Sequence, residues 1–169
     1  MDRQVLIQSE RLTLRRTAPD DLQFVLDTEQ HQENNRFISM WSRELHQDAM
    51  HSEDKLHLIV ESEEERVGYV ILAGLTNPND SIELVRITIS SKGKGHGKET
   101  LQLLQRWTFE QHGGHRLWLD VKDFNTRAQH VYEQMGFVAE GKLRECVKVG
   151  DTYDSLIIMS ILRSEYCSE

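Results

Sequence analysis

The sequence has few cysteines and no long apolar run. Cys146 and Cys167 are the two cysteines among 169 residues, and they show no Cys-x-x-Cys or Cys–His spacing, so neither a disulfide framework nor a zinc site is predicted. No apolar segment approaches the roughly 20 residues that span a bilayer. The N-terminal Met1-Asp2-Arg3-Gln4 lacks the basic start and apolar centre of a signal peptide. We therefore expect a cytoplasmic protein that does not enter a membrane.

Positive charge is also scarce. The chain carries 20 Lys and Arg residues against 28 Asp and Glu residues, a net charge of −8. Nucleic-acid binding requires a basic surface, so this balance argues against it. An acidic surface attracts cationic amines, although a need for solubility explains the same charge. Because the length suits one core and no repeat or linker divides the chain, we expect a single domain over residues 1–169.

What the sequence does contain is a segment rich in glycine and lysine between a predicted strand and a predicted helix. The β-branched run at 82–89 predicts the strand, and apolar residues at helical spacing predict a helix over 99–110. Between them lies Lys92-Gly93-Lys94-Gly95-His96-Gly97-Lys98. Glycines allow close backbone approach, and the first N–H groups of a helix attract anions. The segment predicts a phosphate or pyrophosphate site, although a glycine-rich turn without a ligand fits the same pattern.

Two common nucleotide motifs do not fit this loop. A Walker A loop would need glycine in place of Lys92 and Ser or Thr in place of Glu99. The dinucleotide-binding pattern would need its last glycine where Lys98 and Thr100 stand. The loop resembles instead the Gln/Arg-x-x-Gly-x-Gly/Ala loop of the GCN5-related N-acetyltransferase superfamily, with lysine in the first position and a shorter preceding arm, Ser90-Ser91.

A second segment supports the resemblance. After a predicted strand at 117–121, one helical face carries Ala128, Val131, Tyr132 and Met135. Asn125 or Thr126 can cap this helix and Gly136 can end it. The string Asn-x-x-Ala-x-x-x-Tyr-Glu-x-x-Gly-Phe over 125–137 is similar to the second signature of the superfamily. With the Glu-Arg-Leu-x-Leu-Arg-Arg string at 10–16, the resemblance covers nearly the whole chain, closest to the ribosomal-protein-alanine and spermidine acetyltransferase branch.

The remaining patterns predict an α/β fold. Further strands are expected at 12–15, 56–60, 67–72, 143–149 and 153–162, the last two joined by a turn at 150–151. Helices are expected after a capping Thr17 and from Ser42 to about Met50, with a polar loop at 30–35 between them. We expect a mixed, mostly antiparallel central sheet with helices on both faces. The resemblance implies that the strands ending near Ile89 and Val121 splay apart to admit the cofactor.

The resemblance implies an N-acetyltransferase that moves an acetyl group from acetyl-CoA to a primary amine by direct attack in a ternary complex. The acceptor would be a protein N-terminus, a polyamine or another small amine; a non-catalytic acyl-CoA-binding sensor is the alternative. Backbone groups over 87–89 would pair with the pantetheine arm, the loop would grip the pyrophosphate, and Asn125 would bind pantetheine above a small Ala128. The implied cofactor-binding residues are Ile87, Thr88, Ile89, Lys92, Gly93, Lys94, Gly95, His96, Gly97, Lys98, Asn125 and Ala128.

Two residues are catalytic candidates by the same resemblance. Tyr132 would donate a proton to the departing thiolate, or else be a packed aromatic residue. Glu83, at the start of the central strand, would take the amine proton through water, or else lie on the surface. Strand alternation does not decide which face Arg86 and Asp120 use.

The eight histidines show no metal-spaced pair, so we expect no metal site and no catalytic histidine. His46, His51 and His57 fall in predicted surface or acceptor-side segments, and His96 is expected to face solvent or pack over its helix. Trp41 would line the acceptor pocket or be buried without ligand contact. The sequence leaves the acceptor and the oligomeric state open, and a homodimer is compatible with it.

Overall fold

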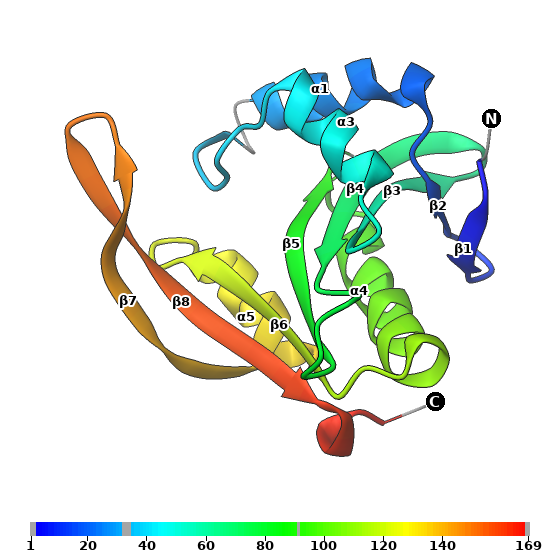
Figure 1. Cartoon of the computed structure of the whole chain (residues 1–169). Coiled ribbons are helices and arrows are strands. Elements are labelled where there is room, and N and C mark those ends of the chain that lie inside the picture. The colour runs from blue at the N-terminus through cyan, green and yellow to red at the C-terminus, as the bar shows by residue number, and fades with distance from the viewer. Residues whose placement is uncertain (1–2, 32–34, 91, 168–169) are drawn as a thin grey trace.

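The computed structural model describes residues 3–31, 35–90 and 92–167, and its strands form one continuous sheet (Figure 1). The strand order is β1-β2-β3-β4-β5-β6-β8-β7. Only β5 and β6 pair in parallel among the described strands, which confirms the predicted mixed, mostly antiparallel sheet. The strands are β1 (Val5–Gln8), β2 (Thr13–Arg16), β3 (Lys55–Ser62), β4 (Glu65–Ala73), β5 (Ser81–Ile89), β6 (Arg116–Lys122), β7 (Val138–Val149) and β8 (Thr152–Leu162).

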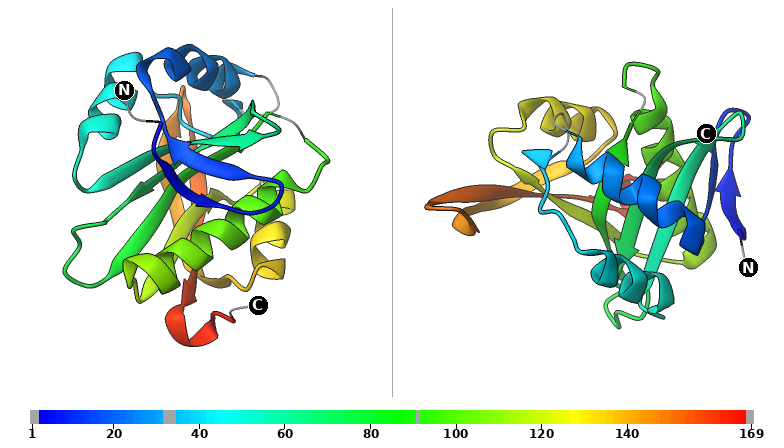
Figure 2. Two further views of the ribbon diagram at one scale, coloured as in Figure 1. Left: turned by 90° about the vertical axis from the view of Figure 1, so that its right-hand side faces the viewer. Right: turned by 90° about the horizontal axis from the view of Figure 1, so that it is seen from above.

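Helices cover both faces of this sheet, as predicted (Figure 2). Leucines of α4 pack with β4 and β5 residues in the larger core, whereas Val25 of α1 packs on Ile59, Tyr69 and Ile71 from the opposite side. The α-helices are α1 (Leu22–Gln30), α3 (Arg43–His51), α4 (His96–Arg106) and α5 (Thr126–Gln134). Short turns complete the fold: the 3₁₀ segments Pro19–Asp21 and Arg163–Glu165 and the π-helical turn Trp107–His112 that extends α4.

Some predicted boundaries were wrong. A strand, β1, precedes the predicted first strand; it is a four-residue edge strand with mostly accessible side chains, so its pattern is weak. The helix α4 begins at His96 rather than at residue 99, because Gly95 caps it. Strand β7 begins at Val138, five residues before the prediction, and nearly all its side chains are exposed, so it lacks apolar alternation. Part of the predicted loop, residues 32–34, and Ser91 of the arm lie outside the described residues.

Thr17 is not the helix cap that the sequence predicted. The 3₁₀ turn begins after Ala18, and the Ala18 N–H donates to Asp21 Oδ2 at 2.8 Å. The Thr17 hydroxyl instead lies 2.8 Å from His57 Nδ1 on β3. The Thr17 hydroxyl is therefore engaged by the buried His57 side chain and does not cap the helix.

The two central strands separate after a short stretch of pairing, as the resemblance implied. The register Ser81↔Arg116, Ile82↔Leu117 and Glu83↔Trp118 is all that joins β5 to β6 among the described residues. On the other side of β5, Leu84 and Arg86 pair with consecutive residues of β4, which leaves Val85 as a bulge. Bulges bend a strand and re-aim its groups. The open edge of β5 beyond Glu83 is therefore available to a ligand.

Strands β7 and β8 extend beyond the rest of the sheet as a long hairpin, which projects from the body in Figure 1. The predicted turn at Gly150 and Asp151 closes it. Four of its large apolar side chains are exposed: Val138, Leu143, Val149 and Tyr153.

Cys146 and Cys167 are exposed and unpaired, and the part of the chain that is described has no helix long and apolar enough to cross a membrane.

Candidate active site

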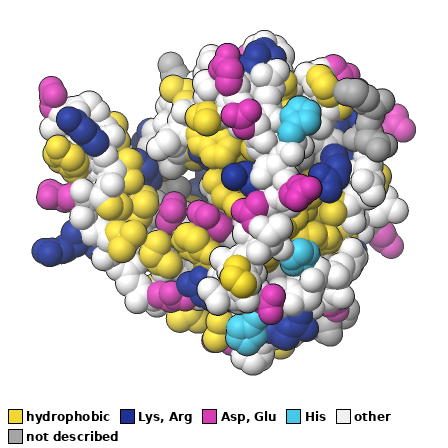
Figure 3. All heavy atoms as spheres, viewed as in Figure 1, with side chains coloured by type: hydrophobic (Ala, Val, Ile, Leu, Met, Phe, Trp, Pro, Cys, Tyr) yellow, Lys and Arg dark blue, Asp and Glu magenta, His cyan; other side chains and the backbone are white. Residues whose placement is uncertain are grey.

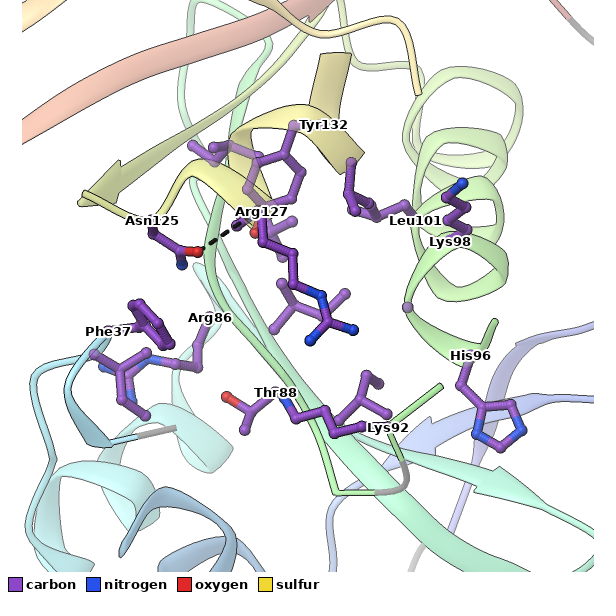
Figure 4. A pocket seen from close by; sticks show the side chains of 18 of the residues that line it. Phe37, Arg86, Thr88, Lys92, His96, Lys98, Leu101, Asn125, Arg127 and Tyr132 are labelled. Carbon is purple, nitrogen blue, oxygen red and sulfur yellow. Dashed lines mark hydrogen bonds between the residues drawn. The ribbon is translucent and has the colours of Figure 1, made fainter. Parts of the chain in front are cut away.

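A cavity of about 820 Å³ opens where β5 and β6 separate (Figure 4). It lies between the end of β5, the glycine-rich loop and the first turns of α4 and α5. Most residues that the sequence assigned to the cofactor meet here, although they come from three separate segments. Of the cofactor-binding candidates, the cavity is lined by Ile87, Thr88, Ile89, Lys92, Gly93, Gly95, His96, Gly97, Lys98, Asn125 and Ala128, whereas Lys94 is not part of its lining. Of the two catalytic candidates, Tyr132 lines the cavity and Glu83 does not.

The backbone of the loop requires glycine at two positions. Gly93 and Gly95 have φ of 79° and 77°, in the left-handed region that other residues rarely adopt. A Cβ added at either of them, or at Gly97, would meet no heavy atom within 4 Å. The space beside all three is open, so a ligand can approach the backbone there. Arg11 Nη2 donates to the Lys94 carbonyl at 2.9 Å and ties the loop to the β1–β2 turn.

Three cationic side chains line the loop end of the cavity: Lys92, Lys98 and Arg127. Figure 4 shows the guanidinium of Arg127 reaching from α5 into the middle of the cavity, between Tyr132 and Lys92. The sequence analysis missed Arg127, although it stands two residues after Asn125 at the start of a helix, where a basic residue adds positive charge to the same cavity. The side chain of Lys94 borders a smaller neighbouring cavity of about 400 Å³ beside Glu10 and Arg11.

Helix α5 presents its first turn and one face to the cavity. Asn125 Oδ1 accepts the Ala128 N–H at 3.2 Å, which confirms the predicted cap. Gly136, with φ of 92°, stands just past the end of the helix as expected. Ala128, Val131 and Tyr132 pack against the core from this face and also line the cavity.

The Tyr132 ring lines the cavity and packs edge-on against Phe137 with ring centroids 5.8 Å apart. Burial, reinforced by the negative charge of Asp120, raises the pKa of the Tyr132 phenol to about 12. The phenol therefore keeps its proton near neutral pH. That is the state a general acid needs.

Asp120, rather than Glu83, brings a carboxylate to the cavity wall. Burial raises the pKa of Asp120, and the charges of Arg86 and Lys122 only partly offset it. Burial and then the charge of Asp120 raise the pKa of Glu83, while Lys55 opposes the shift. The two carboxyl groups therefore influence each other from neighbouring strands. Both hold protons more readily than an exposed carboxylate does.

The side of the cavity away from α4 is aromatic and charged. Phe37 and Phe124 lie with ring centroids 5.9 Å apart, and the Arg36 guanidinium carbon lies 4.4 Å from the centre of the Phe37 ring. Arg86 reaches this side from β5, beside Phe37 in Figure 4. In the space-filling view, acidic side chains gather at the centre of the face between the β7–β8 hairpin and the body (Figure 3). We refer to the side of the cavity lined by Arg36, Phe37, Arg86 and Phe124 as the acceptor half, and to the side beside the glycine-rich loop as the cofactor half.

Of the three histidines expected in surface or acceptor-side segments, two do not lie on the surface. His46 and His57 are buried and in contact, with His46 Nδ1 2.9 Å from His57 Nε2, whereas His51 is exposed as expected. His96 is buried, with 5% of its surface exposed, which excludes the solvent-facing alternative of the two expected for it. Trp41 does not line the cavity; its ring packs near His46 at 5.3 Å. Among the described residues, no group of three or more His, Cys, Asp or Glu side chains is placed to hold a metal ion.

Comparison with known proteins points to one family. Residues 22–137 match the sequence model of the acetyltransferase (GNAT) family. A spermidine N(1)-acetyltransferase from Vibrio cholerae is 29% identical over 170 residues, which cover 94% of this chain and 96% of that protein. The Escherichia coli K12 enzyme of the same name is 26% identical over 127 residues, 75% of this chain and 68% of the other.

Solved structures agree with the sequence comparison. The crystal structure of the V. cholerae spermidine N-acetyltransferase in complex with CoA and spermine superposes with a TM-score of 0.82 at 26% identity, covering 93% of this chain and 98% of that one. The glycine loop with its cations, the protonated tyrosine and the splayed strands have the chemistry expected for acetyl-CoA. The chain belongs to the acetyltransferase (GNAT) family and is an acetyl-CoA-dependent N-acetyltransferase.

Proposed function

We propose that the acceptor amine attacks acetyl-CoA directly in the cavity between β5 and β6, with Tyr132, Glu83 and Asp120 handling the protons. The observation that carries this proposal is the layout of the cavity. Three cations, Lys92, Lys98 and Arg127, line the same cavity as the Tyr132 phenol and the Asp120 carboxylate, and Asp120 is close enough for its charge to raise the pKa of the phenol. Such a layout holds both substrates at once, so proximity supplies a large part of the rate and no covalent enzyme intermediate is needed.

The cofactor half supports a specific placement of acetyl-CoA. The open edge of β5 over Ile87, Thr88 and Ile89 would pair with the pantetheine arm as an added strand. A backbone N–H near the Val85 bulge would hold the acetyl oxygen as negative charge develops on it. The amide nitrogen of Asn125, whose Oδ1 already caps α5, would donate to pantetheine above Ala128.

The loop would bind the pyrophosphate through its backbone donors and its cations. Gly93, Gly95 and Gly97 leave room for the phosphates, and Lys92, Lys98 and Arg127 add charge. His96 would contribute mainly its backbone N–H at the start of α4, because its side chain is buried. Lys94 is placed to act through the field of its charge, since its side chain borders the neighbouring cavity.

Two proton movements complete the reaction. Tyr132 would donate its proton to the thiolate of CoA as that group leaves. The ammonium form of the acceptor would lose its proton toward Asp120 and Glu83, directly or through water. The raised pKa values of both carboxyl groups support this role, because a base must hold the proton that it removes.

We propose a cationic amine, and first of all a polyamine such as spermidine, as the acceptor. The V. cholerae and E. coli relatives are spermidine acetyltransferases, and one V. cholerae structure contains spermine. The net charge of −8 and the acidic side chains that gather between the β7–β8 hairpin and the body fit a cationic substrate (Figure 3). Asp120, whose carboxylate lines the cavity, would receive the reacting ammonium group.

A thiol-release assay tests the proposal. Purified protein is mixed with acetyl-CoA and each of four amine classes: spermidine, a peptide with N-terminal Ala or Ser, a free amino acid and an aminoglycoside. We expect thiol release with the polyamine, and mass spectrometry should show one added acetyl group. Tight CoA binding without release for any amine would favour the acyl-CoA-binding sensor instead.

We also propose self-association through the β7–β8 hairpin. One V. cholerae relative is described as dodecameric, and the exposed Val138, Leu143, Val149 and Tyr153 give this hairpin an apolar surface. Residues 1–169 would act as one domain in the cytoplasm, where the two exposed thiols, Cys146 and Cys167, remain reduced.

A further inference from the structure

A buried carboxylate, Glu29, lies behind the acceptor half at the centre of a polar cluster. Its side chain is 1% exposed, and its Oε1 accepts from Tyr69 Oη at 2.7 Å and from Arg86 Nη1 at 2.6 Å. Burial disfavours the charged form, but the hydrogen bonds of His46 and Tyr69 and the positive charge of Arg86 outweigh it and lower the pKa of Glu29. Glu29 is therefore an ion that the fold keeps charged in its interior.

A chain of three side chains supports Glu29 from the side away from the cavity. His46 Nε2 lies 3.0 Å from Glu29 Oε1, and His46 Nδ1 lies 2.9 Å from His57 Nε2. Burial lowers the pKa of His57 to about 3, so His57 is neutral. The relay links Thr17 Oγ1 to His57 Nδ1 at 2.8 Å, His57 Nε2 to His46 Nδ1, and His46 Nε2 to Glu29, with the direction of each donor set by the His tautomers.

On the other side, Glu29 and Arg86 hold one segment of chain at two points. Arg86 Nη2 donates to the Ser39 carbonyl at 2.7 Å, and the Trp41 N–H donates to Glu29 Oε2 at 3.3 Å. The three residues just before Ser39, residues 36–38, line the acceptor half of the cavity. The guanidinium carbon of Arg86 also lies 5.5 Å from the centre of the Trp41 ring. The wall of the acceptor half is thus fastened to a buried ion pair.

Stability alone gives a weak reason for this arrangement. Buried ion pairs lose so much hydration that apolar residues of similar size often serve a fold as well or better. A hydrogen-bonded ion pair adds a fixed orientation, because its donors and acceptors bind well only within a narrow range of angles. Here the geometry being fixed is that of the segment beside the cavity.

We propose that Glu29 is a positioning residue for the acceptor: through Arg86 and the Trp41 N–H it fixes residues 36–41, and so sets how well the enzyme binds and orients its amine. This inference rests on the proposed function, which places the acceptor in this half. Tyr69, His46 and His57 act through Glu29 and do not touch the amine. The loop glycines and the cations Lys92, Lys98 and Arg127 take no part in these contacts, so we expect the acetyl-CoA KM not to depend on them.

The test compares Glu29→Gln with a matched control, Asp21→Asn. Asp21 is also a buried carboxylate on the same side of the sheet, paired with Arg15 at 2.7 and 3.1 Å, and it does not line the cavity. Both variants should lose thermal stability. With spermidine as the probe amine, only Glu29→Gln should raise the acceptor KM, by about 10- to 100-fold, because small misplacements in a site are costly. The acetyl-CoA KM should stay unchanged.

Amide hydrogen exchange supplies a readout that needs no acceptor. In Glu29→Gln, peptides covering residues 36–41 should exchange faster, while those of β7 and β8 should not change. If Glu29→Gln unfolds, Tyr69→Phe removes one hydrogen bond to Glu29 and should show the same effects more weakly. Equal acceptor KM values and equal exchange over 36–41 in the Glu29 and Asp21 variants would overturn the inference. An absence of acetyl transfer to any amine by the unaltered enzyme would instead refute the proposed function, and faster exchange would still support the anchoring of this segment.

Discussion

The two halves of the cavity are held together in different ways. The cofactor half consists of a backbone loop, two helix starts and cations that are exposed to solvent, namely Lys92, Lys98 and Arg127. The acceptor half is fastened from behind by charged side chains that are almost fully buried, Glu29 and Arg86. The first depends on local chain conformation and the second on contacts between distant elements.

This difference teaches how one fold can serve a constant cofactor and a variable acceptor. Backbone donors at a glycine loop recognise any pyrophosphate and need little support from neighbouring elements. An acceptor wall has to be shaped for its amine, and here a network that spans α1, α3, β3, β4 and β5 shapes it. Most of the experiments below act on one half at a time, so each tests whether the two halves of the cavity are held in different ways.

The largest effect is expected from closing the loop. In Gly95→Val or Gly97→Val a branched side chain would fill the open space beside the backbone, and in Gly95→Val it would also strain a residue with φ of 77°. Both variants should lose measurable CoA binding by calorimetry while unfolding cooperatively. Since Gly97 does not have a positive φ, its variant tests ligand approach without strain. Unchanged CoA affinity in both variants would remove the pyrophosphate from the loop.

Tyr132→Phe acts where the two halves meet. The change keeps the ring that packs on Phe137 and removes the hydroxyl, so the acetyl-CoA dissociation constant should change little. The turnover number should fall on the order of 10²–10⁴-fold, the usual worth of a positioned acid. The comparison needs saturating acetyl-CoA and evidence that chemistry limits turnover. Near-normal turnover would assign the proton to water or to the substrate ammonium.

Smaller losses should follow from removing single cations of the cofactor half. Lys92→Ala and Arg127→Ala should each weaken CoA binding by roughly 0.5–3 kcal/mol, the range for hydrogen bonds to charged groups. Part of this loss should disappear at high salt, because exposed charges are screened. Lys94→Ala serves as the comparison, with a smaller expected effect, since its side chain borders the neighbouring cavity. Identical salt dependence in all three variants and the unaltered protein would leave only the backbone to bind the phosphates.

The smallest effect concerns pH and the support of the acceptor half. The folded state keeps the pKa of His57 at about 3, whereas the unfolded chain takes up a proton near 6.5. The free energy of unfolding should therefore decrease as pH falls below about 6.5, by at most about 1.4 kcal/mol per pH unit. Urea titrations between pH 6.5 and 5 should show a shallower slope in His57→Gln than in the unaltered protein. His51→Gln changes an exposed histidine and should leave the slope as it was.

Most of the cofactor half could be predicted from the amino-acid sequence. Its glycines, the Asn125 cap and the Tyr132 face belong to continuous segments in which local backbone rules decide the conformation. The strand–loop–helix order then places these segments at one edge of the sheet. The same rules missed β1 and the start of β7, because their mostly exposed side chains leave little apolar pattern to detect. Arg127 could also have been predicted from the sequence, since it lies inside the second signature.

The acceptor half was decided only by tertiary structure. Tyr69 and Arg86 lie 40 and 57 positions after Glu29 in the sequence, and no spacing rule predicts that these residues meet. Strand alternation could not assign Arg86 either, because the Val85 bulge interrupts it. Asp120 reaches the cavity wall because β6 separates from β5 after three pairs. The desolvation penalty of a buried charge is offset only where the fold brings its partners within hydrogen-bonding distance. A sequence pattern does not predict which distant residues come that close.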